Sequence, residues 1–175
     1  MFCIILPLII LLLSFNLVLS FYNFNPEQQN GVDFLLGKTA LQEGYTLEEM
    51  THMEDVKGVI QSANLVFLGF LAVLVLVLTY YQRNKEQLKK LFKYGGITTL
   101  SFVGVILLFI VVAWNLTFTI FHKIFFPQGN WQFSSDSLLI TTYPGDFFVR
   151  LSVLIFVGSL FLGSIFILLS KSKRL

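Results

Sequence analysis

Four long, mainly apolar runs determine what this chain of 175 residues can fold into. They cover roughly residues 1–22, 61–81, 96–118 and 147–170. The apolar core of a bilayer is about 30 Å thick and an α-helix rises about 1.5 Å per residue, so each run is long enough to cross it. Within lipid, a single segment can satisfy its backbone polar groups only as a helix. The sequence therefore predicts an all-α membrane protein, a bundle of four transmembrane helices forming one domain over residues 1–175.

The composition supports this class. Hydrophobic residues make up 55% of the chain and charged residues only 13%, whereas about a quarter of the residues in an ordinary soluble domain are charged. No run has an ionisable residue deep in the bilayer, which disfavours a transporter. Small residues in the fourth run favour close helix packing. They are Gly158, Ser159, Gly163 and Ser164.

The first run, residues 1–22, has features of both a secretion signal and a membrane anchor. No Lys or Arg precedes it, its apolar core is longer than that of a usual signal, and the residues near Ser20 make a poor cleavage site. We therefore expect a retained first helix, in which Asn16 hydrogen-bonds to another helix. The single cysteine, Cys3, excludes an intramolecular disulfide.

Positive charge is concentrated in the segment 82–95 and in the tail after residue 170, which together hold eight of the twelve Lys and Arg residues. Cytoplasmic segments carry such an excess. We therefore expect a multi-pass plasma-membrane protein with both termini in the cytoplasm, and with loops 23–60 and 119–146 outside. The eight residues are Arg83, Lys85, Lys89, Lys90, Lys93, Lys171, Lys173 and Arg174. They form an orientation signal without interleaved aromatic residues, so we expect membrane lipid and not nucleic acid as a partner.

The outer loops carry local signals of structure. Thr46 and Glu49 form a capping-box pattern, which predicts a helix that begins before the membrane does. His52 and Asp55 are three residues apart on this helix and share one of its faces. In the second loop, residues 131–133 and 137–141 are expected to form short β segments of a small extracytoplasmic cap.

The only two histidines, His52 and His122, both fall on the predicted outer side. Imidazole titrates near pH 6.5, so either ring can take or give a proton under ordinary conditions. Asp55 could fix the tautomer of one ring, as a carboxylate does in hydrolase triads. Two imidazoles and this carboxylate could instead bind zinc, but no HExxH spacing supports a metal site. We therefore expect neither a metal nor another cofactor.

Several segments resemble the small four-span integral membrane family that contains the bacterial lipoprotein intramolecular transacylase, called Lit. The resemblance extends over nearly the whole chain, and the paired histidine motifs make it fairly specific. It rests on His52–Val56, Phe121–Lys123 and Asn130–Phe133, followed by Asp136, Leu139–Ile140, Tyr143–Pro144 and Phe147–Phe148. Members of this family move one acyl chain of a diacylglyceryl-cysteine lipoprotein from the glycerol sn-2 ester to the cysteine α-amino group. The resemblance implies that His52 and His122 are the two outward-facing histidines on which the family depends.

Such a transfer needs a base for the amine, an acid for the departing glycerol oxygen and donors for the oxyanion. We expect one histidine to be the base and the other the acid, without assigning which. Asp55 would orient His52, and Lys123, Asn130 or the Trp131 N–H would face the oxyanion.

Each supporting residue also has a purely structural interpretation. Asp55 could pair with Lys57, Lys123 could reach lipid headgroups, and Trp131 could be an interfacial anchor. Arg150 is expected to meet a lipid phosphate or an acidic loop residue. The alternative function is a non-catalytic membrane accessory or lipid-binding protein in which both histidines are structural.

Overall fold

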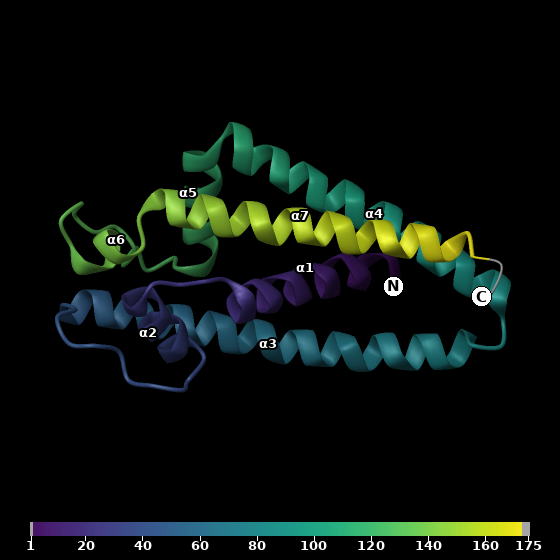
Figure 1. The fold of residues 1–175 in the computed structure, drawn as a ribbon, viewed down its shortest axis with the longest axis horizontal. Coiled ribbons are helices and arrows are strands. Elements are labelled where there is room, and N and C mark those ends of the chain that lie inside the picture. Colours follow the sequence, from purple (N-terminus) through teal and green to yellow (C-terminus); the bar gives the residue numbers. More distant parts are fainter. Residues whose placement is uncertain (1, 173–175) are drawn as a thin grey trace.

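The computed structural model describes residues 2–172, which form helices joined by short loops (Figure 1). In chain order the helices are α1 (Phe2–Phe21), α2 (Pro26–Leu35), α3 (Leu47–Tyr81), α4 (Lys85–Val112), α5 (Trp114–Phe125), α6 (Leu138–Thr142) and α7 (Gly145–Ser170). Lys173 and Arg174, which contribute to the predicted orientation, lie outside the described residues.

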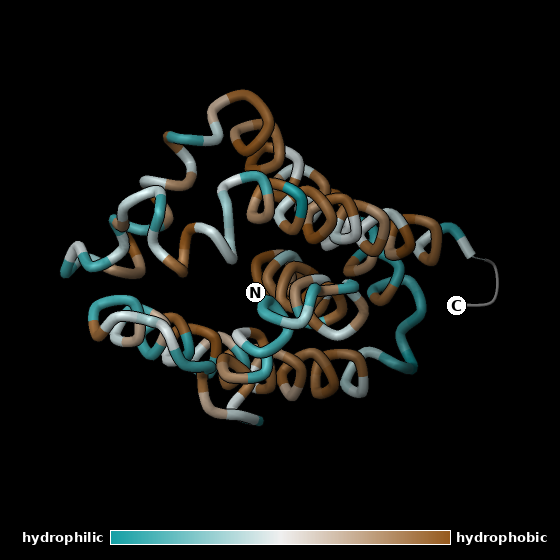
Figure 2. Tube along the Cα trace, turned by 60° about the vertical axis from the view of Figure 1, so that its left-hand side comes forward, coloured by the Kyte–Doolittle hydropathy of each residue, from teal (hydrophilic) through white to brown (hydrophobic). Residues whose placement is uncertain are grey.

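Four helices, α1, α3, α4 and α7, are long and apolar enough to cross a membrane. They run lengthwise through the molecule, and hydrophobic residues line most of their length in Figure 2. The short helices α2, α5 and α6 gather at one end (Figure 1). We call this end the cap and define it as residues 22–60 and 113–146; the four long helices form the bundle.

Within the bundle, α4 and α7 approach each other closely because small residues meet. A Cβ atom added to Gly96 would lie 2.8 Å from the backbone oxygen of Gly163, and one added to Gly163 would lie 2.9 Å from Thr99 Cγ2. Ser159 is fully buried. The prediction of small residues at a helix interface is therefore confirmed for Ser159 and Gly163.

In contrast, α3 packs only lightly on the other long helices. None of the residues in its most apolar 18-residue window is buried. Its polar link to the bundle is a hydrogen bond from Asn16 Nδ2 on α1 to Asn64 Oδ1, at 3.1 Å. This bond confirms the prediction that Asn16 joins two helices.

The cap departs from the sequence predictions in its secondary structure. No strand lies within residues 2–172: residues 131–133 are a turn and irregular backbone, and residues 138–142 form α6. The strand predicted over 137–141 is therefore wrong. Ser137 Oγ accepts the N–H of Ile140 at 3.3 Å and caps a helix, an interaction that a short apolar run does not reveal.

Two further helix boundaries differ from expectation. The predicted third span, 96–118, is interrupted at Ala113, whose φ of −137° and ψ of 50° leave the helical region. As a result α5 is a separate helix that crosses the cap (Figure 1). The first loop contains α2, which starts with a capping box between Asn25 and Gln28 and has Pro26 in its first turn. The predicted capping box at the start of α3 is confirmed.

Candidate active site

The two histidines meet in the cap although 70 residues separate them. His52 lies near the start of α3 and His122 near the end of α5. Their ring centroids are 6.2 Å apart and their ring planes differ by 24°. Both side chains are buried, with exposed fractions of 6% for His52 and 8% for His122. The two rings are thus close together and largely shielded from solvent.

Aromatic side chains surround this pair. The His52 ring lies 4.9 Å from Phe126 and 5.6 Å from Phe133, between centroids. The His122 ring lies 4.0 Å from Phe118 and 4.9 Å from Trp131. These rings exclude water, so charge on either imidazole is poorly solvated.

The protonation of the pair follows from this burial. The pKa of His52 is lowered to about 4: burial lowers it most, the neighbouring His122 also lowers it, and Asp55 and the Asn130 side chain oppose this by raising it. Burial also lowers the pKa of His122, against a hydrogen bond to the Phe118 carbonyl that raises it. Both rings are therefore mainly neutral at pH 7.

The tautomer of His122 is set by α5. Its Nδ1 lies 2.9 Å from the carbonyl oxygen of Phe118, one turn earlier. A carbonyl oxygen can only accept, so Nδ1 carries the hydrogen and Nε2 of the neutral ring has a free lone pair.

Asp55 reaches His52 indirectly. Its Oδ2 accepts hydrogen bonds from Gln128 Nε2 at 2.9 Å and from Asn130 Nδ2 at 2.6 Å, and no direct bond from His52 to Asp55 is found among residues 2–172. The Asn130 side chain also interacts with the His52 ring and raises the pKa of His52, while Asn130 Oδ1 and His52 Nδ1 are buried without a hydrogen bond that meets the usual distance and angle limits. The structure thus places Asn130 between the carboxylate and the ring, and adds Gln128, which the sequence analysis did not select.

The remaining predicted residues differ in their distance from the histidines. Trp131 contacts His122, whereas Lys123 is exposed on α5. Arg150 forms an exposed ion pair with Asp146 at 2.9 Å. Lys57 does not pair with Asp55, since its Nζ lies 4.3 Å from the centroid of the Phe34 ring.

Glu49, one turn before His52, is a buried residue whose sequence context predicts only a helix cap. It is 1% exposed, and its carboxylate accepts from Leu139 N at 2.8 Å, Thr46 N at 2.8 Å and Thr46 Oγ1 at 3.0 Å. Burial raises the pKa of Glu49, but these hydrogen bonds outweigh burial and leave the pKa lowered. The ionised carboxylate therefore ties α3 to α6.

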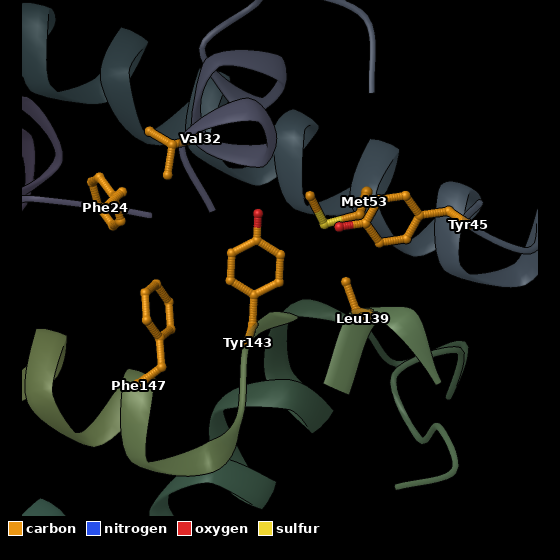
Figure 3. Packing of buried hydrophobic residues seen from close by; sticks show 7 residues of the cluster. All are labelled: Phe24, Val32, Tyr45, Met53, Leu139, Tyr143 and Phe147. Carbon is orange, nitrogen blue, oxygen red and sulfur yellow. The ribbon is translucent and has the colours of Figure 1, made fainter. Parts of the chain in front are cut away.

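A cluster of large side chains supports this connection (Figure 3). Tyr143 points from the segment after α6 towards α2, where its hydroxyl donates to the Gln28 carbonyl at 3.3 Å. Gly31 provides the space, because a Cβ atom there would collide with that hydroxyl. The other members are Phe24, Val32, Tyr45, Met53, Leu139 and Phe147.

Within residues 2–172, no group of three or more His, Cys, Asp and Glu side chains is placed to hold a metal ion. The donors near the histidines are instead the amides and the carboxylate described above. This donor set fits proton transfer and hydrogen bonding to a substrate.

Comparison with known proteins identifies the family. The family described as lipoprotein intramolecular transacylase Lit matches residues 38–148, a range that includes both histidines. The chain belongs to the Lit family. No curated protein sequence matches the chain.

Solved structures agree with this assignment. The membrane-integral lipoprotein intramolecular transacylase Lit from Bacillus cereus superposes with a TM-score of 0.80 and 18% identity, over 96% of this chain and 90% of that one. Two variants of the Bacillus protein, with a histidine replaced by alanine or by arginine, give TM-scores of 0.74 and 0.70, each with 17% identity over 97% of this chain and 89% of that one. This chain therefore has the fold of an integral membrane Lit protein.

Proposed function

We propose that this protein is an intramolecular transacylase that moves the sn-2 acyl chain of a diacylglyceryl-cysteine lipoprotein to the cysteine α-amino group. The observation that carries this proposal is the buried pair of His52 and His122 in the cap of a Lit-family membrane protein. The substrate supplies its own nucleophile, so no serine or cysteine acyl carrier is needed.

The proposal places the cap outside the plasma membrane, where lipoproteins are modified, and the opposite end of the bundle in the cytoplasm. Its support is the excess of Lys and Arg in segment 82–95, which joins α3 to α4 at the end away from the cap (Figure 1). The acyl chains of the substrate would remain in the bilayer while the ester and the amine reach the histidines.

The chemistry begins with the amine. An α-amino group has a pKa of about 7.7–8.0, so at neutral pH it arrives mainly as the ammonium ion. One imidazole accepts the first proton and becomes an imidazolium. The neutral amine then attacks the ester carbonyl carbon, and the second imidazole accepts the proton that the nitrogen loses as the C–N bond forms.

Collapse of the tetrahedral intermediate breaks the bond between the carbonyl carbon and the glycerol oxygen. The imidazolium gives its proton to that oxygen, which leaves as a hydroxyl. The other proton passes to water, so each turnover releases one proton. The products are an amide at the cysteine nitrogen and a free hydroxyl on the glycerol.

We assign the base to His52 and the acid to His122. The pKa of His52 is lowered to about 4, so His52 remains neutral when its partner is protonated. Asp55, acting through Asn130, stabilises the imidazolium that His52 becomes. His122 keeps its Nδ1–H on the Phe118 carbonyl, and its Nε2 carries the proton for the glycerol oxygen.

The other predicted residues take auxiliary roles. Trp131 contacts the His122 ring, and its indole N–H, with the Asn130 amide, would donate to the oxyanion. Lys123 is exposed beside this site and would supply longer-range positive charge. Arg150 forms an exposed ion pair with Asp146, and we expect it to meet a lipid phosphate rather than the reacting groups.

The test is expression in a bacterium whose lipoproteins keep a free diacylglyceryl-cysteine amine, followed by tandem mass spectrometry of the lipoprotein N-terminus. We expect an acyl group on the amine and one on the glycerol. His52→Ala and His122→Ala should each reduce product by about 10²-fold or more. Ile124→Ala, an exposed change on the same helix as His122, is the matched control.

Product unchanged in both histidine variants would overturn the assignment of the site. A well-inserted wild-type protein that yields no product would favour the non-catalytic accessory or lipid-binding alternative.

A further inference from the structure

A polar hollow of about 480 Å³ lies at the start of α3, and nothing in the reaction above uses it. Its walls come from residues 44–49 and from residues 132–138, which lead into α6 and include its first residue. Most of the lining side chains are hydroxyls, an amide and carboxylates, and the lining contains no Lys or Arg. A polar ligand with donor groups would therefore fit it better than an acyl chain.

The hollow adjoins the histidines. Glu48, in its wall, is four residues before His52 on α3, so the two share a helix face about 6 Å apart along the axis. Phe133 also lines the hollow, and its ring centroid lies 5.6 Å from that of His52. Phe133 thus forms a wall shared by the hollow and the site.

The features follow one another along α3 in a fixed order. The hollow comes first, His52 follows one turn later, and the expected membrane span begins near residue 61, about 14 Å further along the axis. The substrate of the proposed function has the same order: a polypeptide, then the cysteine amine and the glycerol ester, then the acyl chains. With the reacting groups at the histidines and the acyl chains in the bilayer, the polypeptide would leave on the side away from the bilayer, which is the side where the hollow lies.

We propose that this hollow binds the residues that follow the lipidated cysteine, and that it favours basic over acidic residues there. The inference rests on the proposed function. Glu48 and Asp136 are exposed carboxylates in its walls, while the Glu49 carboxylate is engaged by Leu139 and Thr46. The hollow would therefore set which lipoproteins are processed fastest.

The experiment compares three synthetic substrates with the full-length protein in detergent micelles. One is diacylglyceryl-cysteine amide, which has no polypeptide. The other two carry the same cysteine followed by Ser-Lys-Lys or by Ser-Glu-Glu. We expect kcat/KM to be about threefold to tenfold higher for the lysine peptide than for the glutamate peptide, with the preference shrinking at high salt.

Two variants locate the preference. The double variant Glu48→Gln/Asp136→Asn should bring the lysine-to-glutamate ratio close to one while leaving turnover of the amide unchanged. Glu27→Gln/Glu54→Gln removes the same charge from exposed cap positions outside the hollow and should keep the wild-type ratio. Ser134→Trp, which fills the hollow, should slow both peptides without slowing the amide.

The outcomes separate the two proposals. Turnover of the amide with equal rates for the two peptides, or a preference that survives in the double variant, would overturn the inference alone. Absence of product from all three substrates would overturn the proposed function, and the inference with it.

Discussion

One contact in the bundle differs in kind from the contacts in the cap: α4 and α7 meet where side chains are small, whereas α2, α3 and α6 meet where side chains are large or polar. Gly96 and Gly163 let α4 and α7 approach until a single added methyl group would press on backbone. In the cap, the buried Glu49 carboxylate and the Tyr143 ring fill the space between α2, α3 and α6.

The two kinds of contact are stabilised in different ways. Lipid gives apolar helices no hydrophobic reason to associate, so the contact between α4 and α7 depends on close approach of their backbones. In the cap, burial of aromatic rings and of a hydrogen-bonded carboxylate can hold α2, α3 and α6 together. The two imidazoles lie in the region whose geometry is fixed by specific side-chain contacts, which suits a site that must hold two rings at a set distance.

The largest loss of stability is expected when Glu49 is replaced. Glu49→Ala removes the acceptor of three hydrogen bonds and leaves the Leu139 N–H buried without a partner, so we expect a loss of about 4 kcal/mol of cap stability. Thermal unfolding in detergent micelles, with limited proteolysis of the cap, would measure it. Glu54→Ala, an exposed change on the same helix, should stay within about 0.5 kcal/mol. Equal effects of the two changes would contradict the role of Glu49.

Acid should weaken the cap before the bundle. The pKa of His52 is about 4 in the folded protein and 6.5 in the unfolded chain, so between these values the unfolded chain binds more protons. Stability is therefore full above pH 6.5 and falls as pH decreases, by about 2 kcal/mol at pH 5. His122, whose pKa is also lowered, adds to the same trend. The free energy of unfolding, measured at pH 7 and at pH 5, tests this expectation. An equally large decrease between these pH values in His52→Gln would contradict it.

In the bundle, Gly96→Ala should cost about 1–3 kcal/mol. The new Cβ atom would lie 2.8 Å from the Gly163 oxygen and 2.6 Å from Ile167 Cγ1, so α4 and α7 would have to separate. Gly104→Ala on the same helix meets nothing within 4 Å and is the control, neutral or slightly stabilising. Thermal unfolding of both variants measures the difference, and matching values would show that close backbone approach does not hold the bundle.

The smallest loss of stability is expected when Asn16 is replaced. Asn16→Leu removes the hydrogen bond to Asn64 that links α1 and α3, and interhelical hydrogen bonds in membranes contribute about 0.6 kcal/mol on average. Unfolding measured beside Asn64→Leu and the double variant gives the pair's contribution. A loss above about 2 kcal/mol would mean that α3 depends on this bond more than its light packing suggests.

The four long helices were predictable because a membrane span requires a long apolar run, and the start of α3 because Thr46 and Glu49 form a local pattern. The pattern of Asn25, Pro26 and Gln28 at the start of α2 is equally local and was overlooked. The break at Ala113 carries no Gly or Pro signal, and α6 depends on a single serine cap.

The candidate site was likewise only partly predictable from local sequence patterns. The resemblance to a family pointed to both histidines, but spacing suggested that Asp55 holds His52 directly. The contact of Asp55 with Asn130 joins residues 75 positions apart, and that of Leu139 with Glu49 joins residues 90 positions apart. Such pairs depend on how the cap folds back on α3, which no local pattern records.

The light packing of α3 leaves its tilt in the membrane dependent on the surrounding lipid. This helix has 35 residues and is therefore about 52 Å long, and lipid contacts most of its apolar surface while its first turns carry His52. The tilt of such a helix depends on the thickness of the bilayer around it, whereas α5, which carries His122, stands on the tightly packed pair of α4 and α7. We therefore expect the length of the fatty acids in the bilayer to influence, through the tilt of α3, how well the two imidazoles are aligned.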